Sequence, residues 1–197
     1  KKRQTLLFSA TYPKKIHLIT KRVMTNPIKV EVDTTHDDTS IQQNFYKVKD
    51  DGQRMTALRL LLLQQRPEST LLFCNTKLET AFVAEQLQDD GFSALALHGD
   101  LEQKERREIL VKFSNKSISV LVATDVAARG LDINKIDVIV NYHMARNPEV
   151  HVHRIGRTGR AGTTGQAYSA AKRPSDVPPA VLSFVSILVT ALIAWLI

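Results

Sequence analysis

Short apolar runs alternate along this chain with stretches in which apolar residues recur at helical spacing. The apolar runs predict strands at 5–8, 28–32, 41–48, 70–74, 93–97, 119–123, 138–141 and 166–169. The helical stretches are 13–23, 55–62, 78–87 and 101–113, with stops at Asn26-Pro27, Pro67 and Gly91. This alternation predicts an α/β fold in three layers, in which helices cover both faces of a parallel sheet.

Ligands of parallel sheets gather at the carboxyl ends of the strands, so the residues that follow each strand are the first candidates for a site. Asn75-Thr76-Lys77 follows the strand at 70–74. Thr76 is placed to cap the next helix, and the backbone N–H groups there are also suited to a phosphate. The pattern leaves both interpretations open.

The strand at 93–97 is followed by His98-Gly99-Asp100. A glycine in this place lets a ligand come close to the backbone. Gln103 and Arg106 lie one turn apart on the next helix and share a face. Arg106 is therefore either a phosphate ligand or an ordinary surface arginine.

A hydroxyl, two carboxylates, an arginine and a glycine follow the strand at 119–123 within nine residues. Thr124 begins this stretch, and Gly130 and Asp132 end it. Asp132 is suited to accept hydrogen bonds from ribose hydroxyls. The alternative is an Asp-rich turn in which Arg129 pairs with a neighbouring carboxylate.

The stretch HRIGRTGRAG at 153–162 is the hardest to explain as a plain surface loop. Arg154, Arg157 and Arg160 recur at every third residue, with glycines between them. Small residues let guanidinium groups converge on one charged object, and the planar fork of arginine suits a phosphate. Three arginines so close together also repel one another, so an anion or carboxylates should offset them.

Composition and charge change this picture little. The 197 residues are 43% hydrophobic and 24% charged, with 27 Lys and Arg against 20 Asp and Glu, which is a globular and moderately basic composition. The basic excess fits a polyanionic partner and simple solubility equally well. Cys74, the only cysteine, excludes an internal disulfide and is expected in the core. His143, His151 and His153 lack the pattern of a zinc site, so no metal site is expected within this chain.

Six strings taken together resemble the second half of the DEAD-box RNA helicases. They are SAT at 9–11, LLFCNTK at 71–77, LHGD at 97–100, QKER at 103–106, VATDVAARGLDI at 122–133 and HRIGRTGR at 153–160. The resemblance covers roughly residues 1–169. LHGDLEQ and NPEVHVHRIGRTGRAG further resemble the bacterial DbpA subgroup of that family.

The resemblance implies a RecA-like fold with defined boundaries. Residues 1–27 would end the first RecA-like lobe, 28–40 would be a linker and entry strand, and 41–170 would form the C-terminal lobe. It also implies roles for twelve residues: Thr76, Gly99, Arg106 and Thr124 on the RNA backbone; Gly130, Asp132, Arg157 and Arg160 on ATP, with the two arginines catalytic at the γ-phosphate; and Ser9, Thr11, His153 and Arg154 in coupling between the lobes.

The resemblance further implies ATP with Mg²⁺ as cofactor, held mainly by the first lobe. This sequence has no GxxxxGK[ST] phosphate loop and no Asp-Glu-Ala-Asp string, so we expect no ATP hydrolysis by this chain alone. The implied partners are the first lobe of the same protein and RNA, ribosomal in the DbpA subgroup, which acts in ribosome assembly. The implied location is the cytoplasm.

The resemblance is lost in the tail at 171–197. Residues 180–197 carry no charge, and as a helix they would measure about 27 Å, near the roughly 30 Å core of a bilayer. A membrane anchor, an altered reading frame and a buried helix are the three interpretations. The alternative function is a non-catalytic RNA-binding module, tethered to a membrane if the tail is an anchor. A DNA-acting relative in the same superfamily is the third candidate function.

Overall fold

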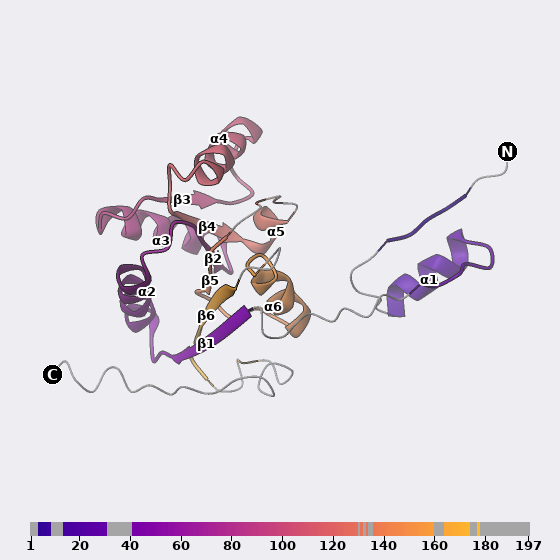
Figure 1. The fold of residues 1–197 in the computed structure, drawn as a ribbon, viewed down its shortest axis with the longest axis horizontal. Helices are drawn as coiled ribbons and strands as arrows, with labels where there is room; N and C mark the ends of the chain where they lie inside the picture. Colours follow the sequence, from indigo (N-terminus) through magenta and orange to yellow (C-terminus); the bar gives the residue numbers. More distant parts are fainter. Residues whose placement is uncertain are drawn as a thin grey trace. The chain divides into compact units, whose positions relative to one another are not determined.

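The computed structural model describes residues 4–8, 14–30, 41–129, 131, 133, 136–159, 164–173 and 177. The chain divides into two compact units, residues 1–36 and 37–197. The first unit contains helix α1 (Lys14–Val23), and the second contains every strand of the sheet (Figure 1).

Strands and helices alternate through the second unit. In chain order they are β1 (Ile41–Lys47), α2 (Asp51–Gln65), β2 (Thr70–Cys74), α3 (Lys77–Asp89), β3 (Ala94–Leu97), α4 (Gln103–Ser114), β4 (Val120–Thr124), α5 (Asp125–Ala128), β5 (Val138–Asn141), α6 (Pro148–Ile155) and β6 (Gly165–Ala171). The six strands predicted between residues 41 and 169 and the four predicted helices are confirmed, with ends shifted by a few residues.

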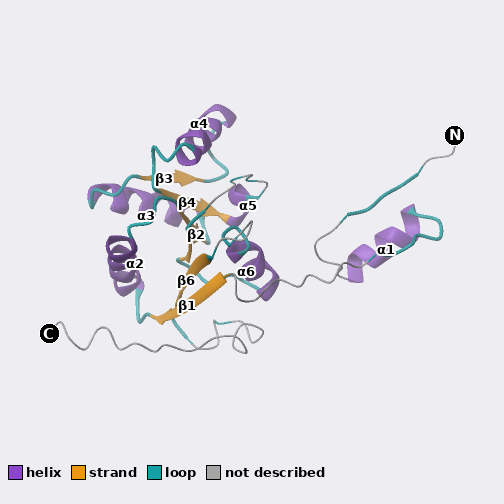
Figure 2. Cartoon of the chain, in the orientation of Figure 1, coloured by secondary structure: helices purple, strands orange, loops and turns teal. Residues whose placement is uncertain are grey.

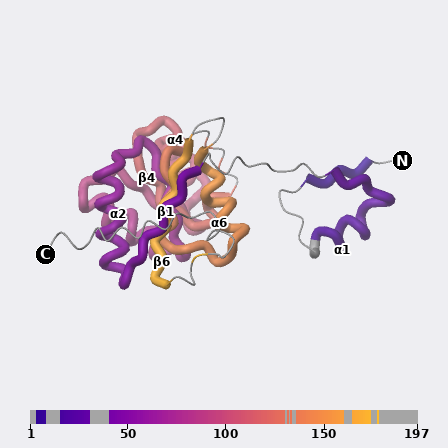
Figure 3. Tube along the Cα trace, turned by 60° about the horizontal axis from the view of Figure 1, so that its bottom comes forward, coloured from indigo at the N-terminus to yellow at the C-terminus, as the bar shows by residue number. Residues whose placement is uncertain are grey.

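The six strands form one sheet in the order β1-β6-β5-β2-β4-β3, and every neighbouring pair is parallel. The edge strand β1 pairs with β6, and the two run side by side from Ile41 opposite Gly165 to Lys47 opposite Ala171 (Figure 3). The expected fold class, a RecA-like parallel sheet, is confirmed.

Helices cover both faces of the sheet (Figure 2). Successive side chains of a strand point to opposite faces, so each strand serves two cores. Leu72 and Cys74 of β2 pack in one core with α2 and α3, whereas Leu71 and Phe73 pack in the other with α4, α5 and α6. The predicted three layers and the buried Cys74 are therefore confirmed.

Short polar sequences fix the ends of the helices. Asp50 caps α2 by accepting a hydrogen bond from the backbone N–H of Gln53 at 2.8 Å. Arg66 ends the same helix in the left-handed conformation, with φ of 44°, immediately before the predicted stop at Pro67. Gly91 follows α3 with φ of 84°, which a glycine adopts without strain.

Helix α1 confirms the helical pattern after Pro13, but the strand predicted at 5–8 is wrong. Residues 4–8 carry no strand, and the side chains of Leu6 and Phe8 are 66% and 88% exposed. A strand needs a hydrogen-bonded neighbour, and no strand pairs with 4–8 among the described residues. Residues 28–30 also form no strand, and Val32 lies outside the described residues.

Two short helices, α5 and α6, were not predicted. Four and eight residues are too few to show a helical period. Helix α6 occupies part of the stretch that the sequence suggested was a polar loop. Asn147 caps the start of this helix, and Pro148 lies in its first turn. This helix carries two of the predicted site residues, His153 and Arg154.

Of the tail, the structure describes 171–173 and Val177. Val177 is buried against Ala171, Phe45 and Met144. The stretch at 180–197, on which the three interpretations of the tail depend, lies outside the described residues. Within the described part of the chain, no helix combines the length and the apolar character needed to cross a membrane.

Candidate functional site

Three predicted site residues stand at the carboxyl ends of three adjacent parallel strands. Thr76 comes after β2, Thr124 ends β4, and Gly99 comes after β3. Because β2, β4 and β3 are neighbours and parallel, their carboxyl ends share one edge of the sheet. An ion pair between Lys77 and Asp100 joins the segment after β2 to the segment after β3.

Thr76 caps helix α3. Its hydroxyl oxygen accepts a hydrogen bond from the backbone N–H of Glu79, and the Glu79 carboxylate accepts one from the backbone N–H of Thr76, both at 3.2 Å. This reciprocal pair is a capping box. The predicted cap is confirmed, and the phosphate role of Thr76 stays a prediction.

Gly99 lies in an open part of this edge. A methyl group added to it would lie 3.7 Å from Cε of Lys77, an ordinary contact. Local packing therefore does not demand a glycine at 99. The open space is consistent with close approach of a ligand to the backbone.

Thr124 caps the short helix α5 and is buried. Its hydroxyl accepts a hydrogen bond from the N–H of Ala127 at 3.3 Å. Arg106 reaches the same helix from α4, because its Nη2 donates to the carbonyl oxygen of Ala127 at 2.6 Å. Two residues of the predicted RNA set thus bond to the same residue of α5.

Arg154 is 2% exposed and forms an ion pair with Asp125, the first residue of α5. Its Nε donates to Oδ1 of Asp125 at 2.7 Å and its Nη2 donates to Oδ2 at 2.9 Å. Its Nη1 donates to Oδ1 of Asn141 at 3.1 Å and to the carbonyl oxygen of His143 at 2.7 Å. The guanidinium also lies over the ring of Phe73, 4.9 Å from its centroid.

This geometry corrects one prediction and confirms another. Arg154 does not converge with its neighbours on a common anion, because its hydrogen bonds are used inside the lobe. The expected offset by a carboxylate is confirmed for Arg154, whose partner is Asp125, and the pairing of Arg129 with a neighbouring Asp stays a prediction. The sequence spacing of three residues does not set a common direction, since Arg154 lies on α6 and Arg157 lies beyond its end.

Arg157 is half-buried, and its Nη1 donates to the carbonyl oxygen of Leu131 at 3.2 Å. Leu131 follows α5, and we call residues 124–129 and 131 the α5 segment. This segment accepts hydrogen bonds from Arg106 of α4, from Arg154 of α6 and from Arg157, which follows α6. His153 is exposed on α6. Ser9, Thr11, Gly130, Asp132 and Arg160 lie outside the described residues.

Sequence reasoning missed a polar cluster around His143, after β5. Nε2 of His143 lies 3.2 Å from Oε1 of Glu79 and 3.2 Å from Nη1 of Arg54. A neutral ring nitrogen either donates or accepts, so His143 serves one of these partners at a time. Burial lowers the pKa of His143 below its ordinary value of 6.5, although the Glu79 carboxylate acts in the opposite direction.

Arg54 is buried on α2, forms an ion pair with Asp51 and lies 5.3 Å from the centroid of the Tyr142 ring. Residues from α2, α3 and the segment after β5 therefore meet beside the cap of α3. No sequence pattern could have joined positions 54, 79 and 143, because their meeting depends on the strand order.

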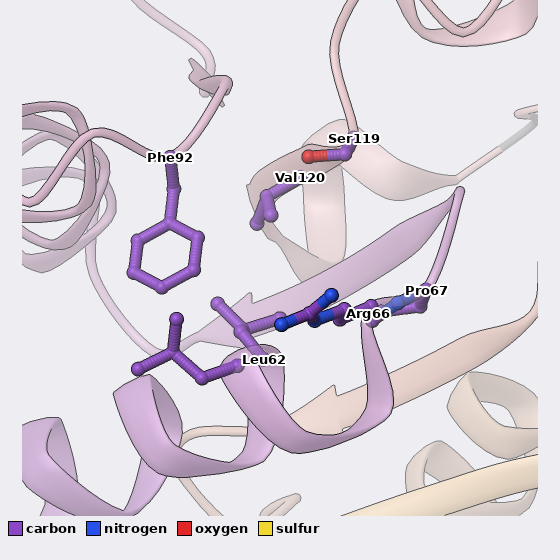
Figure 4. A pocket seen from close by; sticks show the side chains of 7 residues that line it. Leu62, Arg66, Pro67, Phe92, Ser119 and Val120 are labelled. Carbon is purple, nitrogen blue, oxygen red and sulfur yellow. The ribbon is translucent and has the colours of Figure 1, made fainter.

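A pocket of about 230 Å³ lies at the opposite edge of the sheet. Figure 4 shows Leu62, Arg66, Pro67, Phe92, Ser119 and Val120 around it. These residues end α2 or stand at the amino ends of β2, β3 and β4. None of the predicted site residues lines this pocket. Elsewhere in the described ranges, no three His, Cys, Asp or Glu side chains are grouped as metal ligands.

Comparisons with known proteins agree with the geometry. The profile of the helicase conserved C-terminal domain matches residues 53–162. The chain is 53% identical to the ATP-dependent RNA helicase DbpA of Escherichia coli over 167 residues, 85% of this chain and 36% of that protein. It is 46% identical to the DEAD-box ATP-dependent RNA helicase CshA of Bacillus subtilis over 83% of this chain and 33% of that protein. The chain thus spans about a third of these curated relatives.

Solved structures show the same relation. The DEAD-box protein SrmB of E. coli, solved with the regulator of ribonuclease activity A, matches 66% of this chain and 77% of that chain with a TM-score of 0.64 and 34% identity. A DEAD box protein from Methanococcus jannaschii matches 89% of this chain and 46% of that chain with a TM-score of 0.64 and 37% identity. The parallel sheet, the residues at its carboxyl edge and these matches agree: the chain belongs to the family of helicase conserved C-terminal domains and is a RecA-like lobe of the DEAD-box type.

Proposed function

We propose that this chain is the closing lobe of an ATP-dependent RNA helicase that remodels RNA duplexes together with an upstream lobe. One observation carries the proposal. Arg106, from the predicted RNA set, and Arg157, from the predicted nucleotide set, both donate to carbonyl oxygens of the α5 segment, which begins with Thr124 of the RNA set. An element that both ligands contact through such bonds allows the binding of one ligand to affect the binding of the other.

On the RNA side, Thr76, Gly99 and Thr124 stand at the carboxyl ends of three adjacent strands, and Arg106 approaches from α4. Hydroxyls, backbone N–H groups and one guanidinium suit the sugar-phosphate backbone. Such contacts position a strand without reading its sequence. The finer proposal that the RNA is ribosomal rests on the resemblance to the DbpA subgroup alone.

On the nucleotide side, the chain offers donors that fit a phosphate but no phosphate cradle of its own. Arg157 is half-buried with a fork that already bonds to a carbonyl oxygen. In the proposal, Arg157 and Arg160 place positive charge beside the γ-phosphate, Asp132 accepts from the ribose hydroxyls, and Gly130 allows close backbone approach. ATP, with Mg²⁺ held mainly by the upstream lobe, supplies the phosphoanhydride bond whose hydrolysis drives the cycle.

The test is a chimaera in which this chain replaces the matching stretch of E. coli DbpA. We expect the chimaera to hydrolyse ATP when RNA is added and to separate a short RNA duplex. Arg157→Ala should lower kcat by about 10³–10⁵, because removing an arginine finger removes charge from the γ-phosphate. Steady-state ATPase and duplex-separation assays measure both.

Arg146→Ala provides the matched control, since Arg146 is exposed just before α6 and belongs to neither predicted set. It should leave kcat within about twofold. A folded chimaera that binds RNA but never hydrolyses ATP would favour the non-catalytic RNA-binding module. ATP hydrolysis by this chain without any upstream lobe would contradict the proposed division of labour.

A further inference from the structure

The buried ion pair between Asp125 and Arg154 joins two helices that the predicted ligands approach separately. Asp125 is the first residue of α5, directly after the Thr124 cap. Arg154 belongs to the last turn of α6, three residues before Arg157. Nε and Nη2 of Arg154 each donate a hydrogen bond to the Asp125 carboxylate, at 2.7 and 2.9 Å. Two parallel bonds fix an angle as well as a distance.

The surroundings of Arg154 make this pair stiff. Nη1 bonds to Asn141 and to the carbonyl oxygen of His143, so the arginine is also fixed to the end of β5. The Phe73 ring, from the end of β2, closes one face of the guanidinium. The arginine therefore cannot turn toward another partner without losing its hydrogen bonds to α5 and to the end of β5 and its contact with the Phe73 ring.

Asp125 differs from Arg154 in its surroundings. Its side chain is 30% exposed, and its backbone lies within the helix whose residue Ala127 bonds both Thr124 and Arg106. A shift of Asp125 must therefore move the acceptor of Arg106. A shift of Arg154 must move the turn that leads to Arg157, because the N–H of Arg157 donates to the carbonyl oxygen of Arg154 at 3.2 Å.

We propose that Asp125 is a positioning residue that couples RNA contact to nucleotide contact by holding α5 and the end of α6 at one fixed spacing. This inference rests on the proposed function. Neither Asp125 nor Arg154 touches RNA or ATP in this scheme. Their effect passes through Arg106 and Thr124 on one side and through Arg157 on the other.

The proposal predicts a specific kinetic loss. Asp125→Asn in the chimaera keeps the size of the side chain but removes its charge, which weakens the paired hydrogen bonds from Arg154. We expect the RNA-stimulated kcat to fall by about 10- to 100-fold, because small misplacements of a catalytic group have effects of that size. The KM for ATP and the apparent Kd for RNA should each change by less than about threefold, because the direct contacts remain.

Two further variants separate positioning from folding. Asp125→Glu keeps the charge and lengthens the side chain by one methylene, so it should fold and still lose part of the RNA stimulation. Asp90→Asn removes the carboxylate of the Arg59 ion pair at the end of α3, away from α5 and α6. It should leave the RNA-stimulated kcat unchanged. Equal losses in all three variants would mean a purely structural role and would overturn the proposal.

Hydrogen exchange on this chain decides the proposal even if the chimaera is inactive. The N–H of Ala127 bonds to Thr124, and the N–H of Thr158 bonds to the carbonyl oxygen of Ile155 at 3.0 Å. Asp125→Asn should raise the exchange rates of both groups together, by about tenfold or more. Faster exchange at Ala127 alone would show that α5 and α6 are not coupled. An active chimaera whose RNA stimulation survives Asp125→Asn would overturn the inference and leave the proposed function intact.

Discussion

His151 is a titratable side chain that the lobe buries completely. It is 0% exposed on α6, its Nε2 lies 3.0 Å from Oε1 of Gln43, and its ring stacks on Phe45. Burial, followed by the charge of Arg154, lowers the pKa of His151 from 6.5 to about 4. The folded lobe thus holds this ring neutral at a pH where the unfolded chain protonates it.

This pKa predicts a loss of stability in mild acid. The stabilising contribution is present above pH 6.5 and is lost as the pH falls toward 4, because only the unfolded chain takes up the proton in that window. Between about pH 7 and pH 5, the free energy of unfolding should fall by about 2 kcal/mol through this residue. Urea unfolding of the chain at both pH values measures the change.

His151→Gln supplies the comparison, since an amide can still donate to Gln43 but does not titrate. The variant should lose about 2 kcal/mol less than the parent chain over the same pH range. Identical profiles for the parent and His151→Gln would show that His151 is not the source.

At the scale of elements, two glycines of the lobe differ in the reason for having no side chain: packing requires a glycine at 165, whereas packing does not require one at 99. A methyl group on Gly165, at the start of β6, would lie 2.5 Å from the backbone nitrogen of Gly159 and 2.6 Å from Thr158. Thr158 is buried, and its hydroxyl donates to the carbonyl oxygens of Ile136 and Asp137, so it cannot move aside. The turn after α6 and the first residue of β6 therefore fit only without a side chain at 165.

Gly165→Ala should destabilise the lobe by about 1–3 kcal/mol, the usual effect of overpacking. Gly99→Ala, where the added methyl meets only ordinary contact with Lys77, should change stability by less than about 0.5 kcal/mol. If the backbone at Gly99 approaches RNA, Gly99→Ala should nonetheless weaken RNA binding. Thermal unfolding and fluorescence anisotropy on both variants measure these effects, and unchanged RNA affinity in Gly99→Ala would remove Gly99 from the RNA set.

Elements with a clear period could be predicted from the sequence, and elements that depend on neighbours could not. The apolar runs located β1 to β6, and Thr76 marked the start of α3. Helix α5 has only four residues, too few for a period, and its form depends on the Thr124 cap. The apolar run at 5–8 has strand character, but the described residues provide it with no strand partner.

The candidate site was predictable to the same extent. The parallel pattern placed Thr76, Gly99 and Thr124 at one edge, because that edge follows from topology. The partner of Arg154 was not predictable. Asp125 lies 29 positions earlier, and only the packing of α5 against α6 brings the two side chains together. The same holds for His143 and Glu79, which meet across β2 and β5.

The chain is basic as a whole, but several cations of its second unit are already engaged in ion pairs inside the chain. Lys77 pairs with Asp100, Lys116 with Glu68, Lys172 with Asp51 and Arg154 with Asp125. The predicted RNA set holds one cationic side chain, Arg106, beside hydroxyls and backbone groups. The net charge of +7 therefore does not translate into an equal number of phosphate contacts.

We therefore predict a shallow salt dependence of RNA binding by this chain. For single-stranded RNA, the slope of log K against log salt is roughly −0.7 per neutralised phosphate, so one or two contacts give a slope of about −1. Fluorescence anisotropy with a short single-stranded RNA, between about 50 and 200 mM salt, measures it. Arg106→Ala should flatten the slope further, whereas Arg146→Ala should not. A slope steeper than about −3 would mean that dispersed positive charge holds the RNA. That result would contradict the backbone contacts assigned here and favour the non-catalytic RNA-binding module.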